Sequence, residues 1–251
     1  LIRGNCIMLK VLFVSSEVSP YAKSGGLGDV AGSLPKALKN MGVDVRVVFP
    51  KYKTIKPEYT ESAKYVGSYK VKLDWREQSA SVYQLDSDVT TYIIENDYYF
   101  SNRDGYYGYG DDGERFIFFS KAALDILNVI DFIPDVIHCN DWQTGPVCLY
   151  VKDYYKRFLS LKDVKTLYTI HNLQYQGICG KDILGLMGLN DGYFASDKLE
   201  FNGMISFMKA GLVYADAINT VSRTYADEIQ TGQYGYGLDG MLRARSADLS
   251  G

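Results

Sequence analysis

An apolar run that leads into a glycine-rich loop constrains the fold of this chain more than any other feature. The run, 10–16, predicts a buried strand, and the loop at 23–30 opens a helix predicted over 27–41. A second apolar strand follows at 44–50. Two strands joined by a crossover helix form a βαβ unit, and such a unit belongs to a parallel sheet.

The same alternation of strands and helices resumes in the second half of the chain. Strands are predicted at 135–139, 165–170 and 217–221, and helices at 114–129, 145–159, 201–214 and 223–230, the last capped by Ser222. Between the two halves, 64–95 contains short stretches of alternating polarity that are typical of antiparallel strands. We therefore predict an α/β fold, in which a Rossmann-like parallel sheet carries flanking helices and a small β insertion.

Length and composition narrow the class of protein. The 251 residues can bury a sizeable core, and a net charge of −3 favours neither nucleic acid nor an anionic membrane as a partner. No apolar stretch reaches the roughly 18 residues that span a bilayer. The four cysteines (Cys6, Cys139, Cys148 and Cys179) form no C-x-x-C pair, which argues against zinc and against a disulfide framework. We treat 8–251 as one domain and 1–7, which precede Met8, as an extension or cloning remnant.

Polar clusters follow the predicted buried strands, at the point where each strand ends. Glu17 follows the first strand, Asp141 follows another, and His171 and Ser222 follow two more. In an open parallel sheet, ligands bind at the carboxyl ends of the strands. The sequence therefore predicts one crevice into which these side chains converge.

The glycine-rich loop suits an anion or a polar ligand. Unpaired amides at the start of a helix attract anions, Gly25 and Gly26 allow close approach, and Lys23 adds a full charge. The loop is neither G-x-G-x-x-G nor a P-loop, because its glycines are adjacent and its lysine precedes them. A plain turn that needs glycine is the simpler alternative. Asp29, in the first turn of the helix, either interacts favourably with the helix dipole or faces the ligand. A buried Glu17 needs a partner such as Lys23 or a ligand hydroxyl.

Several residues near the other strand ends suit a sugar. Asp141 can accept hydrogen bonds from hydroxyl groups and Trp142 can stack on a pyranose, although a helix cap and a core tryptophan would explain them equally. A lone histidine is more often structural, which is our interpretation of His138, but the strand-end position of His171 favours a site. Tyrosine is abundant, at 22 residues, and Tyr99 stands in one of its clusters as a candidate for sugar contact.

A family resemblance rests on several separated motifs. Lys23-Ser-Gly-Gly-Leu-Gly-Asp-Val30 matches every position of the K-[ST]-G-G-L-[AG]-D-V signature of bacterial glycogen synthases and plant starch synthases. His138, Asn140, Asp141 and Trp142 match H-x-[HN]-D-W, with Gln143 where the family often has histidine. The segments 169–177, 200–203, 209–212 and 220–222 continue the resemblance in the same order. It covers nearly the whole chain.

The resemblance implies a glucosyltransferase of the GT-B type, in which two Rossmann-like domains face one another across a cleft. Such enzymes move glucose from ADP-glucose, or a related nucleotide sugar, to the non-reducing end of an α-1,4-glucan with retention, and they need no metal or other cofactor. In that family Lys23 would contact the donor, Glu17 would lie on the acceptor side, and His171 would lie near the transferred glucose. Asn172 would join the polar lining, and Asn202, on a helix opened by 200–203, would help to shape the sugar site.

The resemblance also implies that this chain is the N-terminal half of such an enzyme. We expect a missing C-terminal domain to supply most nucleotide contacts, so the chain by itself should be inactive. A bacterial cytoplasmic origin is expected, with a plastid as the alternative in a plant. A non-catalytic glucan-binding module is the second hypothesis for its function. A nicotinamide-dependent oxidoreductase is a third, which the absence of G-x-G-x-x-G disfavours.

Overall fold

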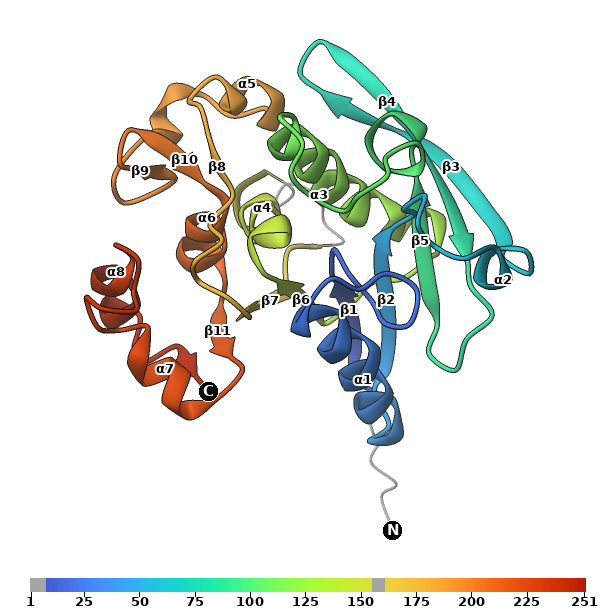
Figure 1. The fold of residues 1–251 in the computed structure, drawn as a ribbon, viewed down its shortest axis with the longest axis horizontal. Coiled ribbons are helices and arrows are strands. Elements are labelled where there is room, and N and C mark those ends of the chain that lie inside the picture. Colours follow the sequence, from blue (N-terminus) through green and yellow to red (C-terminus); the bar gives the residue numbers. More distant parts are fainter. Residues whose placement is uncertain (1–7, 155–160) are drawn as a thin grey trace.

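One long sheet organises the chain (Figure 1). In the computed structural model, which describes residues 8–154 and 161–251, nine strands form this sheet in the order β12-β11-β7-β6-β1-β2-β5-β4-β3. They are β1 (Lys10–Val14), β2 (Asp44–Pro50), β3 (Lys64–Leu73), β4 (Arg76–Gln84), β5 (Thr91–Glu95), β6 (Val136–Asn140), β7 (Lys165–Ile170), β11 (Ala217–Thr220) and β12 (Leu249–Ser250). From β12 to β5 every neighbouring pair is parallel, which confirms the predicted α/β class.

The helices are short, apart from two. They are α1 (Gly26–Asn40), α2 (Pro57–Thr60), α3 (Asp112–Val129), α4 (Gly145–Leu149), α5 (Ile183–Met187), α6 (Phe207–Tyr214), α7 (Arg223–Glu228) and α8 (Asp239–Ala244). The helix α4 packs against both α3 and α6, whereas α1 packs on β2. Right-handed crossovers explain this division, because β1 to β2 and β6 to β7 run across the sheet in opposite directions and so place α1 and α4 on opposite faces.

The predicted β insertion is antiparallel, as expected, and it extends the main sheet. β3, β4 and β5 form an antiparallel meander, and β5 then pairs in parallel with β2, with Val47 opposite Thr91. The tip of β3 and β4 projects at the top of the molecule in Figure 1. The insertion therefore lies at one end of the sheet, with β1 and β6 near the middle.

Two of the predicted helices are shorter than expected. The helix expected at 145–159 is α-helical only to Leu149 and continues as a π-helical turn, Tyr150–Tyr154; the rest of that prediction lies outside the described residues, as do 1–7. The helix expected at 201–214 begins only at Phe207. Its first part is instead a hairpin of β9 (Glu200–Phe201) and β10 (Met204–Ser206), in a small sheet with β8 (Ile178–Cys179).

The turn of this hairpin explains why the helix prediction was wrong. Asn202 and Gly203 have φ angles of 51° and 79°, so both lie in the left-handed region. An Asn-Gly pair adopts this conformation readily and makes a tight hairpin turn, whereas a helix cannot continue through it. Asn202 is thus a turn residue, and the prediction that 200–203 opens a helix is corrected.

We expect Gly203→Ala to lower the free energy of unfolding by about 1 kcal/mol. A Cβ atom at Gly203 meets no atom within 4 Å, so the cost comes from the backbone and not from a clash. Urea denaturation measures it. Gly240→Ala is the matched control, because Gly240 is exposed within α8 and alanine there favours the helix. Equal effects of the two substitutions would contradict the assignment of the turn.

Candidate active site at the carboxyl edge of the sheet

The sheet brings the predicted polar residues to one edge. Glu17 follows β1, Asp141 follows β6 and His171 follows β7, and these three strands are parallel neighbours. The chain leaves β1 toward β2 on one side and later returns to β6 on the other. Ligands in such sheets bind at this reversal of strand order, outside the carboxyl ends of the strands. The candidate site therefore lies between the loops after β1 and β6.

Glu17 holds the glycine-rich loop. Its buried carboxylate accepts hydrogen bonds from the backbone amide and hydroxyl of Ser24, the latter at 2.7 Å, and from the amide of Gly25 at 3.3 Å. The hydroxyl of Tyr107 donates a further bond at 2.6 Å. These groups, and not Lys23, are the partners that a buried carboxylate requires. Glu17 therefore acts as an internal anion at the loop, which leaves the first amides of α1 for a ligand.

The predicted contact residues of the loop are accessible. The Lys23 amine lies 2.7 Å from the Asp29 carboxylate, and their side chains are 47% and 58% exposed. An ion pair with this exposure contributes little to stability, so a ligand can replace Asp29 as the partner of the lysine. At Gly25 and Gly26, a Cβ atom would meet no other atom within 4 Å. A larger residue at either position would therefore not clash with the rest of the chain, and the space beside both glycines is open to a ligand.

Asp141 occupies an unusual backbone conformation. Its φ and ψ are 56° and −178°, a region nearly confined to glycine. The conformation directs one carboxylate oxygen to the amides of His171 and Asn172, at 2.7 and 3.3 Å. Burial raises the pKa of Asp141 to about 7, against the opposing effect of these two amides. Asp141 thus fixes the loop after β7 and titrates near neutral pH.

Both histidines lie in this region, and both are held by polar neighbours. The Nε2 atom of His171 is 3.0 Å from Oδ1 of Asn140, and burial lowers the pKa of His171 to about 4. His138 is almost fully buried, with Nε2 at 2.6 Å from the Thr169 hydroxyl, and burial lowers its pKa to about 3. Both rings are therefore neutral at pH 7. The contacts of His138 are those of a structural residue.

Trp142 packs in an aromatic cluster beside the crevice. Its ring meets Phe116 edge-on at 5.0 Å and lies 6.4 Å from the rings of Tyr107 and Phe207. A Cβ atom on Gly177 would overlap the indole, so glycine is needed there for close packing. The side chain remains partly exposed. Stacking of a pyranose on this ring stays a prediction.

One predicted contact residue is buried in the core, and another lies on a different element from the predicted one. Tyr99 has no exposed surface, its ring packs 5.0 Å from Phe118, and its hydroxyl donates to Glu114. It is a core residue in this structure, and its assignment to the sugar site is corrected. Asn202 lies in the β9–β10 turn. Asn172 does follow β7 and is exposed, and its Oδ1 atom accepts a bond from the Gln174 amide at 3.0 Å.

Residues that sequence reasoning did not single out support the site. Tyr107 bridges Ser16 and Glu17, with its hydroxyl 2.9 Å from that of Ser16. Tyr225, on α7, accepts a bond from the amide of Leu173 at 3.0 Å and so ties the loop after β7 to α7, the helix that follows the neighbouring strand β11. In the sequence, only the abundance of tyrosine pointed to these two residues, and it did not indicate which tyrosines would bond to the loops of the candidate site.

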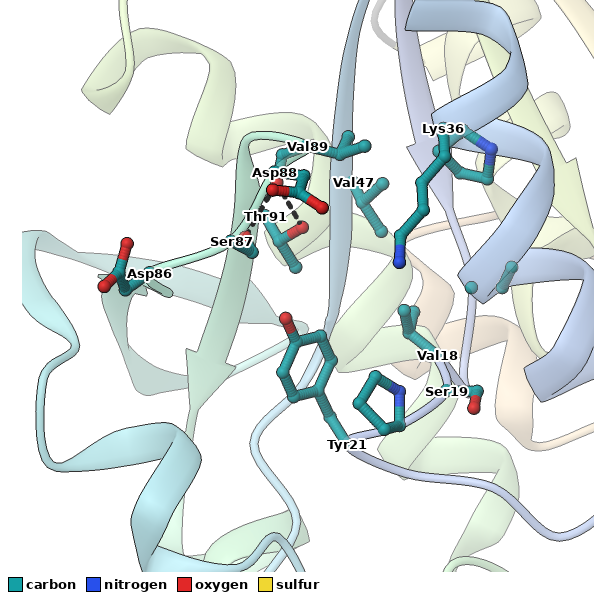
Figure 2. Close-up of a pocket in the computed structure, with 14 residues that line it drawn as sticks. Val18, Ser19, Tyr21, Lys36, Val47, Asp86, Ser87, Asp88, Val89 and Thr91 are labelled. Atoms are coloured by element: carbon teal, nitrogen blue, oxygen red, sulfur yellow. Dashed lines mark hydrogen bonds between the residues drawn. The ribbon is translucent and has the colours of Figure 1, made fainter.

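A separate cavity of about 290 Å³ lies between α1 and the residues that lead into β5 (Figure 2). The side chains of Tyr21 and Lys36 reach into it, and Val47 and Val89 line it. None of the predicted site residues lines this cavity. Among the described residues, no helix is long and apolar enough to cross a membrane.

Comparison with known proteins decides the family. The model of the starch synthase catalytic domain matches residues 10–244. The chain belongs to this family. It is 51% identical over 246 residues to a glycogen synthase of Clostridium novyi and 51% identical over 245 residues to one of Geobacillus stearothermophilus. Each alignment covers 97% of the chain, but only 51% and 50% of the relative, so the chain spans about half the length of these curated relatives.

A solved structure agrees with this assignment. The catalytic domain of starch synthase IV from Arabidopsis thaliana, bound to ADP and acarbose, superposes with a TM-score of 0.89 at 30% identity. The match covers 96% of the present chain and 50% of the chain of the solved relative. The sheet and its carboxyl edge are therefore those of the family.

We expect Tyr107→Phe to lower the free energy of unfolding of this starch synthase domain by about 1–2 kcal/mol, because the buried Glu17 carboxylate loses a donor. Hydrogen exchange at the Ser24 amide should also become faster, since Glu17 holds that amide. Tyr106→Phe is the control: the Tyr106 ring packs at 4.8 Å from Tyr52, but no hydrogen bond of its hydroxyl is found among the described residues. Similar losses for the two variants would argue against the bridge.

Asp141→Asn should change how stability depends on pH. A carboxyl whose pKa rises on folding stabilises the protein at low pH, and this contribution is lost as the pH rises to about 7. Asparagine keeps an acceptor for both amides without a charge. The variant should therefore gain about 2–3 kcal/mol relative to the parent between pH 5 and pH 8, measured by urea denaturation. A difference that does not vary with pH would contradict the raised pKa.

Proposed function

We propose that this chain is the acceptor-side half of a retaining glucosyltransferase, a glycogen or starch synthase that moves glucose from ADP-glucose to the non-reducing end of an α-1,4-glucan. The observation that carries the proposal is that the Glu17-held loop, Asp141 and His171 lie at one edge of the sheet in a chain of this family. The solved relative, which is bound to ADP and acarbose, supports a nucleotide and a sugar as ligands. A bacterial cytoplasmic location fits the curated relatives, which are bacterial glycogen synthases.

The residues of the crevice suggest a division of roles. Lys23 and the first amides of α1 would hold the phosphate end of the donor, exchanging Asp29 for phosphate. Gly25 and Gly26 would let that end approach the backbone. Lys23 is the single cation of the predicted site residues, so the remaining charge of a diphosphate would be met by the part of the relatives that lies outside this match.

The neutral groups of the crevice would frame the glucose. Neutral His171 and the side-chain carboxamide of Asn172 offer hydrogen bonds to hydroxyl groups, and Trp142 offers a ring face. The acceptor 4-hydroxyl would attack the anomeric carbon on the face from which the diphosphate leaves. One C–O bond forms, the C–O bond to phosphate breaks, and the leaving phosphate takes the proton. The chain contributes position and electrostatic stabilisation, without a covalent nucleophile.

The proposal predicts transfer only when a second half is present. The purified 251-residue chain should transfer no glucose from radiolabelled ADP-glucose to glycogen. A fusion of residues 1–251 to the C-terminal half of the Clostridium novyi relative should do so, and Lys23→Ala in that fusion should reduce transfer at least about tenfold through lost phosphate contact. Lys36→Ala is the matched control, because Lys36 faces the separate cavity. Transfer by the isolated chain would refute the half-site proposal.

Binding of the acceptor can be followed in the chain as it stands. It has two tryptophans, and Trp75 is 83% exposed at the tip of β3 and β4. In Trp75→Phe, fluorescence therefore reports on Trp142 alone, and titration with maltotetraose should change it. A response to maltotetraose combined with an inactive fusion would favour the glucan-binding module over the enzyme.

A further inference from the structure

Asn140 is the last residue of β6, at the carboxyl edge of the sheet, and it contacts Val14 on β1 and His171 just after β7. Its side chain has no exposed surface. The Nδ2 atom lies 3.0 Å from the carbonyl oxygen of Val14 on β1 and 3.4 Å from that of His138. The Oδ1 atom lies 3.0 Å from Nε2 of His171, just after β7. One carboxamide thus joins three adjacent strands.

The chemistry of these groups fixes every donor and acceptor. A backbone carbonyl only accepts hydrogen bonds, so the atom of Asn140 that faces Val14 must be its NH₂ group. The atom that faces His171 is then the carboxamide oxygen, which also only accepts. His171 must therefore donate from Nε2. A neutral imidazole carries one proton, so its Nδ1 atom keeps a lone pair.

We propose that Asn140 is a positioning residue that holds His171 as the neutral Nε2–H tautomer, so that Nδ1 serves the site as a hydrogen-bond acceptor. His171 would then accept a bond from a ligand hydroxyl and would act neither as a cation nor as a proton donor at that atom. The identity of the ligand, a glucosyl hydroxyl, rests on the proposed function. The tautomer itself does not.

The surroundings of the ring agree with a neutral imidazole. His171 is partly buried, and its Nδ1 atom has no hydrogen-bond partner among the described residues. The Asp141 carboxylate contacts the backbone amide of His171 at 2.7 Å. The other histidine of the chain, His138, is itself neutral because burial lowers its pKa to about 3. Burial likewise lowers the pKa of His171, which keeps the ring uncharged at neutral pH.

Nitrogen NMR of the ¹⁵N-labelled 251-residue chain tests the proposal. The chain contains two histidines, so long-range ¹H–¹⁵N spectra at pH 7.5 show two rings, and His171→Gln assigns them. We expect the pattern of the Nε2–H tautomer for His171, favoured by about tenfold or more. In Asn140→Ala this preference should shrink by about the same factor. Thr169→Val is the control, because it removes the partner of His138 and leaves that of His171 in place.

Each outcome has a defined meaning. Protonation of His171 on Nδ1 in the parent chain, or an unchanged tautomer ratio in Asn140→Ala, would overturn the proposal. If Asn140→Ala does not fold, the spectrum of the parent chain decides the matter by itself. The measurement uses no nucleotide sugar or glucan. Failure of glucosyl transfer in the fusion would therefore leave this result standing, and the reverse also holds.

Discussion

The need to pair two buried carboxylates shapes the candidate site of this chain. An unpaired carboxylate inside a protein is costly, so its position is tolerated only where several donors point at it. Glu17 and Asp141 meet this need with backbone amides from the loops beside them. The hydrogen bonds that satisfy each carboxylate therefore also hold a loop in place. Because the two residues follow adjacent strands, the two fixed loops stand at the same edge of the sheet.

The charged and titratable side chains of this chain determine the electrostatic potential at the candidate site. Glu17 occupies loop amides that would otherwise attract an anion, and Asp141 carries a pKa near neutrality. The charge of Glu17 also contributes to raising the pKa of Asp141. Positive charge comes from Lys23, which is exposed and exchangeable. The full positive charge therefore stands at the start of α1, whereas the group beside the neutral ring of His171 is a carboxyl that titrates near neutral pH.

The sequence predicted the sheet well and the details of packing less well. The strands at 44–50 and 165–170 were predicted residue for residue, because β-branched and aromatic residues are frequent in both. The hairpin at β9 and β10 was missed because Phe201, Ile205 and Met208 recur at helical spacing. The Asn-Gly pair at 202–203 was the stronger local signal, and it determined the structure.

The same contrast explains which site residues could be predicted. Glu17, Asp141 and His171 were found because the end of a strand is visible in a sequence. Tyr99 and Tyr107 belong to neighbouring clusters, and a π-helical turn at Asp97–Ser101 turns the first into the core. No pattern in the sequence encodes that rotation. The partners of Glu17 could not be predicted from the sequence either. The sequence suggests Lys23 as the counter-ion, whereas in the fold backbone amides donate to the carboxylate.

A row of polar side chains crosses the sheet near its carboxyl edge, where apolar packing would be the ordinary solution. Asn140 joins Val14 to His171, and two residues earlier on the same strand His138 contacts Thr169, which bonds in turn to Asn219 on β11. Each link leaves a donor facing an acceptor, so the row avoids the cost of unsatisfied buried groups. A polar row of this kind permits one arrangement of donors, whereas an apolar core tolerates several packings. The precision of the strand ends, including the strained backbone of Asp141, thus follows from hydrogen bonding within the sheet.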